Sequence, residues 1–307
     1  MSGRFAPSPT GDLHLGNLRT AVIAWLAARA AGVDFIIRME DLDIVQASPE
    51  HERSQLADLA ALEITSDVEV IRQSERFDRY HAAIDDLTAR GLTYECFCSR
   101  REVRAEIENS TSAPHLPPGS YPGTCRDLTD AQRVRRARDR PPALRLRAPD
   151  GEVMTVVDQV AGEFAGGVDD TVLRRNDGVP SYNVAVVLDD AAQGVTQVVR
   201  GDDLLSSTPR QIHLQRLFDV ATPTYAHVPL VIGGDGERLS KRHGSVTLGD
   251  LAHIGLGPLD VLTWIGHTLG RAFEPRPESI EDALAAMLDR FDVRTLASDP
   301  VVAPLWS

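Results

Sequence analysis

Two short segments, far apart in the chain, carry residue types suited to holding a nucleotide phosphate. The first runs from Pro7 to Asn17 and places Gly11, His14 and Gly16 between a predicted strand and a predicted helix. Glycines let a ligand approach the backbone closely, a helix N-terminus attracts phosphate, and an imidazole beside it adds a donor. Taken alone, such a short pattern is more often an ordinary strand-to-helix turn.

The second segment contains the only lysine of the chain, Lys241, among 32 positively charged residues. It reads Arg-Leu-Ser-Lys-Arg from Arg238 to Arg242 and follows a glycine-rich turn at Gly233 to Gly236. A lysine offers a slim, mobile ammonium where an arginine offers a planar fork, so this position suits a cation that moves onto a phosphate during transfer. An exposed basic turn is the alternative for this segment alone, but the two segments in this order favour a phosphate site.

All three cysteines lie within 30 residues, at Cys96, Cys98 and Cys125. Residues two apart in an extended strand project from one face, so Cys96 and Cys98 can share one metal ion. Structural zinc prefers thiolates and takes four ligands, which requires one further side chain. His115, in the loop between the cysteines, is the chemically ordinary candidate. Three buried thiols without a metal are the alternative.

The residues that position the first segment have the pattern of a strand, a helix and a second strand. A short strand from Arg4 is stopped by prolines, Leu18 to Ala31 is an alanine-rich apolar helix, and Asp34 to Met39 is a nearly continuous apolar strand, as in a buried parallel sheet. Loops at the carboxyl ends of such strands are placed for ligands. Further expected elements are a helical region at about 52–91, strands at 181–188, 195–200 and 228–232, and helices at about 209–218, 258–269 and 280–291.

The chain has 307 residues and a mass of 33.5 kDa, enough for two domains with an inserted lobe. With 42% hydrophobic and 25% charged residues, the composition excludes a disordered or collagen-like chain, and three cysteines exclude a disulfide framework. We expect an α/β fold with a Rossmann-like parallel sheet and helices on both faces. Its expected parts are a first catalytic half at 1–94, an inserted zinc-containing α+β lobe at 95–178, a second catalytic half at 179–249 and a short helical C-terminal cap at 250–307.

The formal net charge of −13 excludes a generally basic surface that would bind nucleic acid throughout. One local patch, Arg126 to Arg147, contains eight arginines and three aspartates and is a candidate for phosphate contacts; a solvated helix face is the alternative. No membrane partner is expected, because the longest apolar stretch, Ala21 to Ala31, contains Arg29 and is shorter than the ~20 residues that cross a bilayer. The odd cysteine count and the poor match to a signal peptide favour a cytoplasmic protein.

Five segments between residues 4 and 249 resemble the glutamyl branch of the class I aminoacyl-tRNA synthetases. They read RFAPSPTGDLHLGNLRTA, RMEDLD, GVPSYNVAVVLDD, VVRGDDLLSSTPRQ and RLSKR. Within them, HLGN at 14–17 and RLSKR at 238–242 are similar to the HIGH and KMSKS signatures of that class. Two positions differ: Asn17 stands where the family has its final histidine, and Arg238 replaces the first lysine, which leaves Lys241 as the essential cation.

This resemblance implies binding of ATP, with Mg²⁺, and of L-glutamate. The residues implied to contact ATP are Gly11, His14, Gly16, Asn17, Arg238, Ser240 and Lys241, of which His14 and Lys241 are implied to be catalytic. Those implied to bind glutamate are Arg4, Ser8, Glu40, Tyr182 and Arg200. Guanidinium forks suit the side-chain carboxylate of such a substrate. Taken singly, Arg200 is equally well explained as a surface cation and Tyr182 as a core ring.

A family of short paralogues within this branch, the glutamyl-queuosine tRNA(Asp) synthetases, is similar in two further respects. Its C-x-C…Y-x-x-x-C zinc site implies one structural zinc ion held by Cys96, Cys98, Tyr121 and Cys125, and the 58 residues after position 249 are too few for a separate anticodon-binding domain. The implied reaction is ATP-dependent formation of glutamyl-adenylate and transfer of glutamate to the queuosine base at the wobble position of tRNA(Asp). The alternatives are an ordinary glutamyl-tRNA synthetase that charges the tRNA 3′ end, and a non-catalytic tRNA-binding paralogue.

Overall fold

The centre of the molecule is a seven-stranded sheet in the computed structural model, which describes residues 1–109, 120–234, 236 and 246–304. Its strands run in the order β3-β2-β1-β9-β10-β6-β7, and neighbours are parallel except for the antiparallel pair β6 and β7. The bounds are β1 Ser2–Phe5, β2 Asp34–Met39, β3 Ile71–Arg72, β6 Val153–Asp158, β7 Gly162–Gly167, β9 Val195–Gly201 and β10 Thr224–Val228. Because the strand order reverses between β1 and β9, a crevice for a ligand is expected at their carboxyl ends.

Residues of the strands alternate between two hydrophobic cores, one on each face of the sheet. In β2, Phe35 and Ile37 belong to the first core, whereas Ile36 belongs to the second. The first core is covered by α1 Leu15–Ala30, α9 Pro258–Thr268 and α10 Ile280–Leu288, and the second by α3 Phe77–Ala89, α6 Tyr182–Ala192 and α7 Thr208–Leu217. Helices on both faces of a mainly parallel sheet confirm the predicted fold class.

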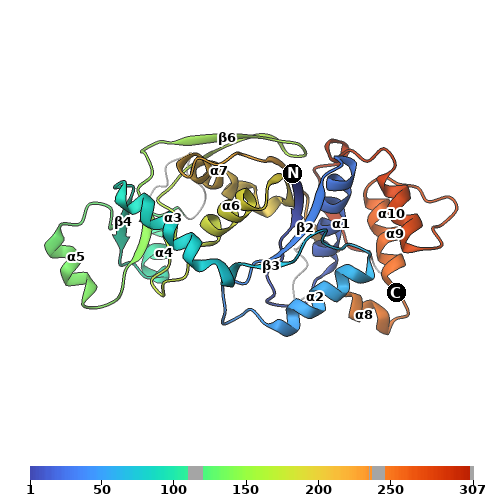
Figure 1. Ribbon diagram of the computed structural model, residues 1–307, viewed down its shortest axis with the longest axis horizontal. Coiled ribbons are helices and arrows are strands. Elements are labelled where there is room, and N and C mark those ends of the chain that lie inside the picture. Colours follow the sequence, from blue (N-terminus) through green and yellow to red (C-terminus); the bar gives the residue numbers. More distant parts are fainter. Residues whose placement is uncertain (110–119, 235, 237–245, 305–307) are drawn as a thin grey trace.

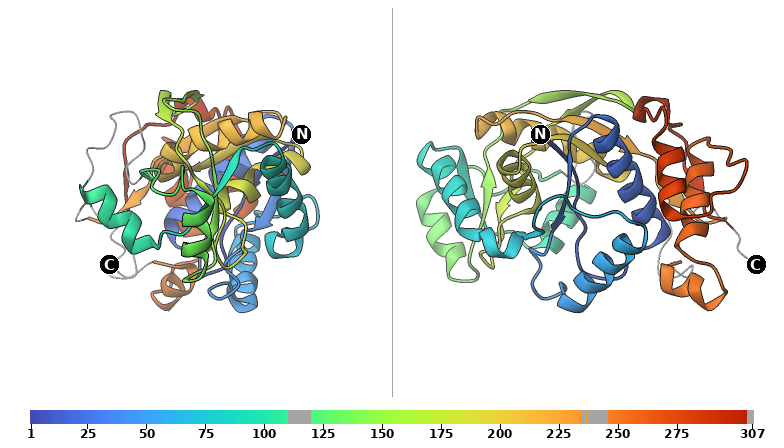
Figure 2. Two further views of the ribbon diagram at one scale, coloured as in Figure 1. Left: turned by 90° about the vertical axis from the view of Figure 1, so that its left-hand side faces the viewer. Right: turned by 45° about the vertical axis from the view of Figure 1, so that its right-hand side comes forward.

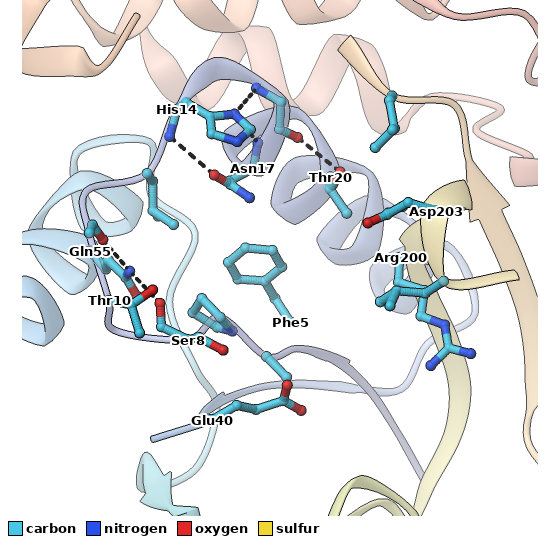
Figure 3. Close-up of a pocket in the computed structure, with 18 of the residues that line it drawn as sticks. Phe5, Ser8, Thr10, His14, Asn17, Thr20, Glu40, Gln55, Arg200 and Asp203 are labelled. Carbon is cyan, nitrogen blue, oxygen red and sulfur yellow. Dashed lines mark hydrogen bonds between the residues drawn. The ribbon is translucent and has the colours of Figure 1, made fainter. Parts of the chain in front are cut away.

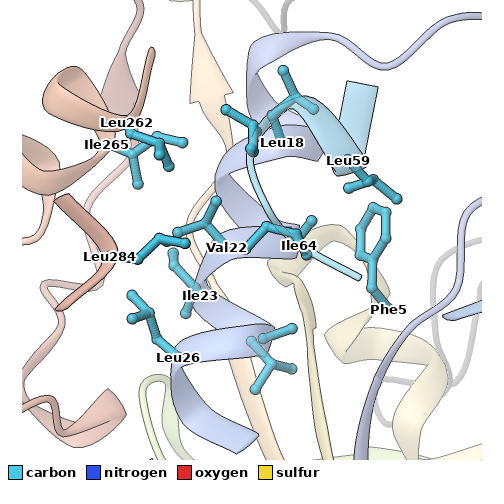
Figure 4. Close-up of a cluster of buried hydrophobic side chains, with 14 of the residues drawn as sticks. Phe5, Leu18, Val22, Ile23, Leu26, Leu59, Ile64, Leu262, Ile265 and Leu284 are labelled. Carbon is cyan, nitrogen blue, oxygen red and sulfur yellow. The ribbon is translucent and has the colours of Figure 1, made fainter. Parts of the chain in front are cut away.

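Helix α1 is buried on most sides because it lies between the sheet and the C-terminal helices. Figure 4 shows Leu18, Val22 and Leu26 of this helix between sheet residues and the side chains of α9 and α10. A helix with apolar residues on most of its faces is typical of such a buried layer. The helix therefore ties the C-terminal region directly to the strand that carries Arg4.

A small lobe lies at one end of the molecule, and the C-terminal helices lie at the other (Figures 1 and 2). The lobe consists of an antiparallel sheet, in the order β4-β5-β8, and two helices. Its bounds are β4 Thr93–Cys96, β5 Ala143–Leu146, β8 Val172–Arg174, α4 Arg100–Asn109 and α5 Asp130–Ala137. At the other end are α8 Leu248–His253 and a two-stranded sheet of β11 Val231–Ile232 and β12 Val301–Val302. None of the helices in the described ranges has both the length and the apolar run that a membrane span requires.

Three expectations for secondary structure are wrong. Residues 181–188, predicted as a strand, form the first part of α6; a short apolar run that is buried on all sides fits either element, and the residues from Val184 to Asp190 are all buried. The helical region at about 52–91 is divided into α2 Pro49–Ala61, β3, the 3₁₀ turn η1 Gln73–Arg76 and α3. The strand expected at 228–232 is interrupted, because Pro229 follows β10 and cannot donate a ladder hydrogen bond. The other described 3₁₀ turns are η2 Asp202–Ser207 and η4 Val293–Thr295.

Removing a side chain from α1 should destabilise the whole molecule. Ile23 is fully buried in the first core, and the change Ile23→Ala should lower the free energy of unfolding by about 2–5 kcal/mol, because it leaves a cavity. Urea denaturation followed by circular dichroism measures the change. Ile254→Ala is the matched control, since Ile254 is 57% exposed and its truncation should change stability by no more than about 0.5 kcal/mol. Equal effects of the two substitutions would contradict this account of the core.

Candidate active site

A cavity of about 760 Å³ opens at the carboxyl ends of β1 and β9. Nine of the predicted site residues line it, namely Arg4, Ser8, Gly11, His14, Gly16, Asn17, Glu40, Tyr182 and Arg200. In Figure 3, His14 and Asn17 lie at one end of the cavity, Glu40 lies at the opposite end, and Arg200 lies on the side wall. The three remaining predicted ATP contacts, Arg238, Ser240 and Lys241, fall outside the described residues. The structure therefore brings the described candidates into one space of the size that small-molecule sites have.

His14 begins helix α1 and is fixed there by a reciprocal cap. Its ring nitrogen Nδ1 accepts hydrogen bonds from the backbone amides of Gly16, at 3.1 Å, and Asn17, at 3.4 Å. In return, the side-chain oxygen of Asn17 accepts from the backbone amide of His14 at 3.2 Å. An acceptor nitrogen carries no proton, so the neutral ring has its N–H at Nε2. Asn17 thus supports the helix start, which explains why an amide serves at this position.

The segment after β11 returns to the same turn. The amide of Leu15 donates to the carbonyl of Val246 at 3.1 Å, and His14 forms an isolated β-bridge with Thr247. On the other side, a side chain at Gly16 would meet Val231 of β11 at 3.5 Å and the ring of His14 at 3.0 Å. Chain positions 231 and 246, which precede and follow the lysine segment, therefore both lie against the His14 turn.

The loop between β1 and α1 is held in place by a buried glutamine that the sequence did not single out. The side-chain amide of Gln55, from α2, donates to the carbonyls of Ser8, at 3.0 Å, and Gly11, at 2.6 Å. The amide of Glu40 donates to the carbonyl of Pro7 at 2.9 Å, which joins the end of β2 to the same loop. These bonds satisfy backbone groups that would otherwise be buried without partners.

The wall of the cavity near Glu40 contains a cluster of buried charges. Asp190 accepts from Arg38 at 2.8 Å and from Arg4 at 3.4 Å, and Arg38 also pairs with Glu40 at 3.3 Å. Arg200 is 5% exposed and belongs to the same cluster. Arg4 and Arg38 both contact the carboxylate of Asp190, whereas the described hydrogen bonds of Arg200 all go to neutral groups. Buried charge is costly unless it is paired, so a ligand carboxylate placed against Arg200 would be favourable.

The titration of the two carboxylates follows from this burial. Although burial disfavours its charged form, the neighbouring Arg38 and Arg4 lower the pKa of Asp190. For Glu40, burial has the larger effect and raises the pKa, with Arg38 and Arg4 opposing it. Burial likewise raises the pKa of Tyr182, which keeps this phenol protonated as a hydrogen-bond donor in the cavity. Asp190 is therefore the fixed anion of the cluster.

The predicted cysteine cluster is present in the lobe. The three Sγ atoms lie within 4.8 Å of one another, and those of Cys98 and Cys125 are 3.5 Å apart. The hydroxyl of Tyr121 lies 3.4 Å from the Sγ atoms of both Cys96 and Cys98. A hydrogen bond from Cys98 holds the pKa of the Cys96 thiol well below its usual range. His115 lies outside the described residues, so the described donor set is three thiols and one phenol, which fits the preference of zinc for sulfur.

Comparisons with known proteins identify the family of the chain. A family profile described as "tRNA synthetases class I (E and Q), catalytic domain" matches residues 1–270. A glutamyl-Q tRNA(Asp) synthetase of Nocardia farcinica is 56% identical over 290 residues, which cover 94% of this chain and 91% of that protein. A glutamate–tRNA ligase of Alkalilimnicola ehrlichii is 40% identical over 299 residues, which cover 96% of this chain and 62% of that protein.

The chain belongs to the class I tRNA synthetases of the E and Q type. It is accordingly a ligase. A solved structure of a glutamate tRNA ligase from Elizabethkingia meningosepticum agrees with its fold at a TM-score of 0.80 and 26% identity, covering 98% of this chain and 66% of that chain. The resemblance inferred from the sequence motifs is thereby confirmed at the level of the family.

In this synthetase, the arginines between positions 126 and 147 divide into two groups. Six have contacts within the lobe. Arg126 pairs with Asp170 at 2.6 Å, Arg136 donates to the Sγ of Cys125 at 3.4 Å, Arg145 lies 3.7 Å from the ring centre of Tyr121, and Arg147 pairs with Asp127 at 3.1 Å. Arg133 and Arg140 are half-buried and pair with Asp130 at 3.3 Å and Glu102 at 2.9 Å. Arg135 of α5 and Arg138, directly after it, are exposed, so the candidate surface for phosphate contacts is α5 with the residue that follows it rather than the whole patch.

Sequence reasoning missed two buried charges of this synthetase, Arg38 and Asp190. Both lie in otherwise apolar runs, DFIIRM and YNVAVVLDD. A charged residue inside such a run is either exposed at the end of the element or buried with a charged partner. For Arg38, the only usable sequence signal of burial is the alternation of residues along β2. Its partner Asp190 comes from a distant segment, so the pair could not be identified from spacing.

Breaking the buried pair should cost more stability than breaking a surface pair. Asp190→Ala leaves two arginines without their shared carboxylate and should lower the free energy of unfolding by about 3–5 kcal/mol. Asp86→Ala, which breaks the exposed pair with Arg90, should cost at most about 1 kcal/mol.

The pH dependence distinguishes an electrostatic from a packing effect. Because the pKa of Asp190 is lowered by folding, its stabilisation is present above the unfolded-state pKa, near about 4, and is lost as the pH falls further. The stability difference between the wild type and Asp190→Ala should therefore shrink in urea titrations below about pH 4. A difference that stays constant with pH would mean that the aspartate acts by packing.

Proposed function

We propose that this synthetase activates L-glutamate with ATP and transfers it to the queuosine base at the wobble position of tRNA(Asp). The observation that carries the first half is the buried guanidinium of Arg200, whose described hydrogen bonds go to neutral groups, in a cavity that also contains the helix start at His14. The γ-carboxylate of glutamate supplies an anion that can lie directly against this guanidinium. Triphosphate binds well at a helix N-terminus.

In the first step, the α-carboxylate of glutamate attacks the α-phosphorus of ATP and pyrophosphate leaves. Such a reaction needs positioning and neutralisation of phosphate charge more than covalent help from the protein. The Nε2–H of His14 donates to a phosphate oxygen, the dipole at the start of α1 favours the negative charge there, and Lys241 supplies the mobile charge. Gly11, Gly16, Asn17, Arg238 and Ser240 complete the proposed ATP contacts. Mg²⁺ accompanies ATP and is held mostly by phosphate oxygens.

Within the glutamate site, each side chain has a role suited to its chemistry. Arg4 and Arg200 bind the γ-carboxylate together with the hydroxyl of Tyr182, while Glu40 and Ser8 bind the α-ammonium group. Glu40 is held by Arg38 with one of its oxygens, so its other oxygen can accept from the substrate. The activated glutamate is thereby bound at both of its ends.

In the second step, a hydroxyl of the queuosine cyclopentenediol attacks the adenylate carbonyl, and AMP leaves. This acceptor is supported by relatives named glutamyl-Q tRNA(Asp) synthetase, such as the one of Symbiobacterium thermophilum, 42% identical over 321 residues that cover 99% of this chain and 96% of that protein. The exposed arginines at the end of α5, Arg135 and Arg138, provide phosphate contacts for RNA. We also propose that the chain is divided into two catalytic halves at 1–94 and 179–249, an inserted lobe at 95–178 and a C-terminal cap at 250–307. The protein is proposed to be cytoplasmic.

Labelled glutamate tests both steps. With ATP, the wild type should transfer label to tRNA(Asp) that contains queuosine and not to tRNA(Asp) that lacks it. Lys241→Ala should reduce glutamate-dependent ATP–pyrophosphate exchange by about 10²-fold or more, as the loss of a transition-state charge contact does. Charging of unmodified tRNA(Glu) at its 3′ end would instead identify an ordinary glutamyl-tRNA synthetase, and tRNA binding without exchange would identify a non-catalytic paralogue.

A charge-reversed α5 separates the two steps. The triple change of Arg133, Arg135 and Arg138 to Glu should leave pyrophosphate exchange unchanged and weaken transfer to tRNA, because these side chains lie in the lobe, away from the cavity. Exchange and transfer that fall together would show that the substitutions disturb the fold rather than an RNA contact.

We further propose one structural zinc ion per chain, held by Cys96, Cys98, Cys125 and Tyr121. Elemental analysis of the purified protein should give one zinc per chain, and Cys125→Ser should reduce this content and lower the melting temperature. Tyr121→Phe and His115→Ala identify the fourth ligand: the first should weaken zinc retention against a chelator and the second should not. The opposite result would assign the histidine, and a metal-free wild type would contradict the site.

A further inference from the structure

Within the charged cluster of the cavity, Arg200 differs from Arg4 and Arg38 in the partners that hold it. Its Nε donates to Nε2 of His227 at 2.9 Å, one terminal nitrogen donates to the amide oxygen of Gln211 at 2.8 Å, and the other donates to the hydroxyl of Thr208 at 2.8 Å. All three acceptors are neutral. Arg4 and Arg38, by contrast, both contact the carboxylate of Asp190. A guanidinium has five N–H donors, so two remain at Arg200 for a ligand among the described contacts.

His227 is itself held by a buried carboxylate from another strand. Its Nδ1 lies 2.6 Å from Oδ2 of Asp158, and both side chains are completely buried. Asp158 also accepts from the backbone amides of Val160, at 2.9 Å, Ala161, at 2.8 Å, and His227, at 3.1 Å. A carboxyl group surrounded by donors in this way is ionised, and, although burial opposes this, the hydrogen bond from His227 and these amides lower the pKa of Asp158.

The positions of the protons follow from these partners. Because Asp158 can only accept, Nδ1 of His227 must carry a proton, and because Arg200 can only donate, Nε2 must be without one. The ring is therefore neutral, with one defined tautomer. Burial lowers the pKa of His227, which agrees with a neutral ring beside a guanidinium. The ring also stacks on Tyr225, with centroids 5.9 Å apart and planes inclined by 14°, so it cannot turn freely.

We propose that Asp158 and His227 are positioning residues for substrate carboxylate recognition, and that they hold Arg200 through a neutral imidazole so that its charge is left for the substrate. The inference rests on the proposed function. A carboxylate in direct contact would orient Arg200 equally well, but it would neutralise the guanidinium. The interposed ring places Asp158 out of contact while it transmits the orientation, as second-layer carboxylates do for histidines at metal sites.

The residues of β6 and β7 belong to the sequence segment of the lobe, but both strands lie in the main sheet, where β6 contributes Asp158. Asp158 is the last residue of β6 and pairs with Tyr225 of β10, two residues before His227. This pairing brings the carboxylate to the ring from a segment that lies between the two predicted catalytic halves. The glutamate pocket is thus completed by a strand of the inserted segment.

Substitution of His227 should change the use of glutamate and not the use of ATP. In pyrophosphate exchange, His227→Leu should raise the KM for glutamate about 10-fold to 100-fold, the effect of losing a hydrogen bond to a charged group, with the KM for ATP unchanged. His227→Gln retains an acceptor for Arg200 and should recover much of this loss. Discrimination between glutamate and glutamine should fall in His227→Leu, because a displaced guanidinium no longer selects for a carboxylate. His213→Leu is the matched control, since His213 is buried in α7 beside Glu152 and should leave both KM values unchanged.

A spectroscopic measurement on the wild type is independent of any variant. Nitrogen-15 NMR of histidine-labelled protein should show His227 with a protonated Nδ1 and an unprotonated Nε2. A proton on Nε2, or a folded His227→Leu whose KM for glutamate stays within about twofold of the wild type, overturns the proposal. A KM for ATP that rises in parallel with that for glutamate overturns it as well, since a general disturbance of the cavity would then suffice. Absence of glutamate-dependent exchange in the wild type would reject the proposed function instead, while the NMR result would still decide the tautomer.

Discussion

The central constraint in this structure is the burial of three guanidinium groups on three neighbouring strands of the sheet, next to the cavity. Arg4, Arg38 and Arg200 come from β1, β2 and β9, and each is at most 5% exposed. Burying cations is costly unless carboxylates or polar acceptors surround them, so the strands must meet in a register that supplies these partners. Asp190 of α6 satisfies two of the arginines at once, and it fixes the helix against the strand edge. The strand order of the catalytic sheet and the charge balance of its cavity therefore depend on each other.

The same constraint explains how the outer parts attach. The hairpin of β6 and β7 joins the main sheet beside β10, while β4, β5 and β8 of the same sequence region form the separate lobe seen at one end of Figure 1. At the opposite end, α9 and α10 cover α1, whose first residue is preceded by His14. Both attachments thus support elements that shape the cavity, one through Arg200 and the other through the helix start.

Much of this arrangement can be predicted from the sequence where residue type alone determines the outcome. The strand Asp34–Met39, the helix after His14 and the clustering of three cysteines follow from local patterns, and the motif resemblance gives the family. Periodicity fails for 181–188, because a segment buried on every side has no face to mark. The electrostatic partners are also missed: nothing local to Asp158 or Asp190 indicates that it will meet an arginine or a histidine from a strand tens of residues away. Such contacts between residues far apart in the sequence can be identified only once the fold is known.

The different treatment of Arg4 and Arg200 gives a physical basis for selecting an acidic substrate. Arg4 shares a carboxylate, so much of its charge is neutralised before any ligand binds, whereas Arg200 has neutral hydrogen-bond partners and keeps its charge. Under the proposed function, a glutamate γ-carboxylate lies against this charge, but the isosteric amide of glutamine would leave the buried cation without an anion in direct contact. Leaving a buried charge uncompensated costs several kcal/mol, far more than the difference in shape between the two side chains. In the proposed function, discrimination therefore arises less from contacts made to glutamate than from the cost of excluding water from Arg200 without an anion beside it.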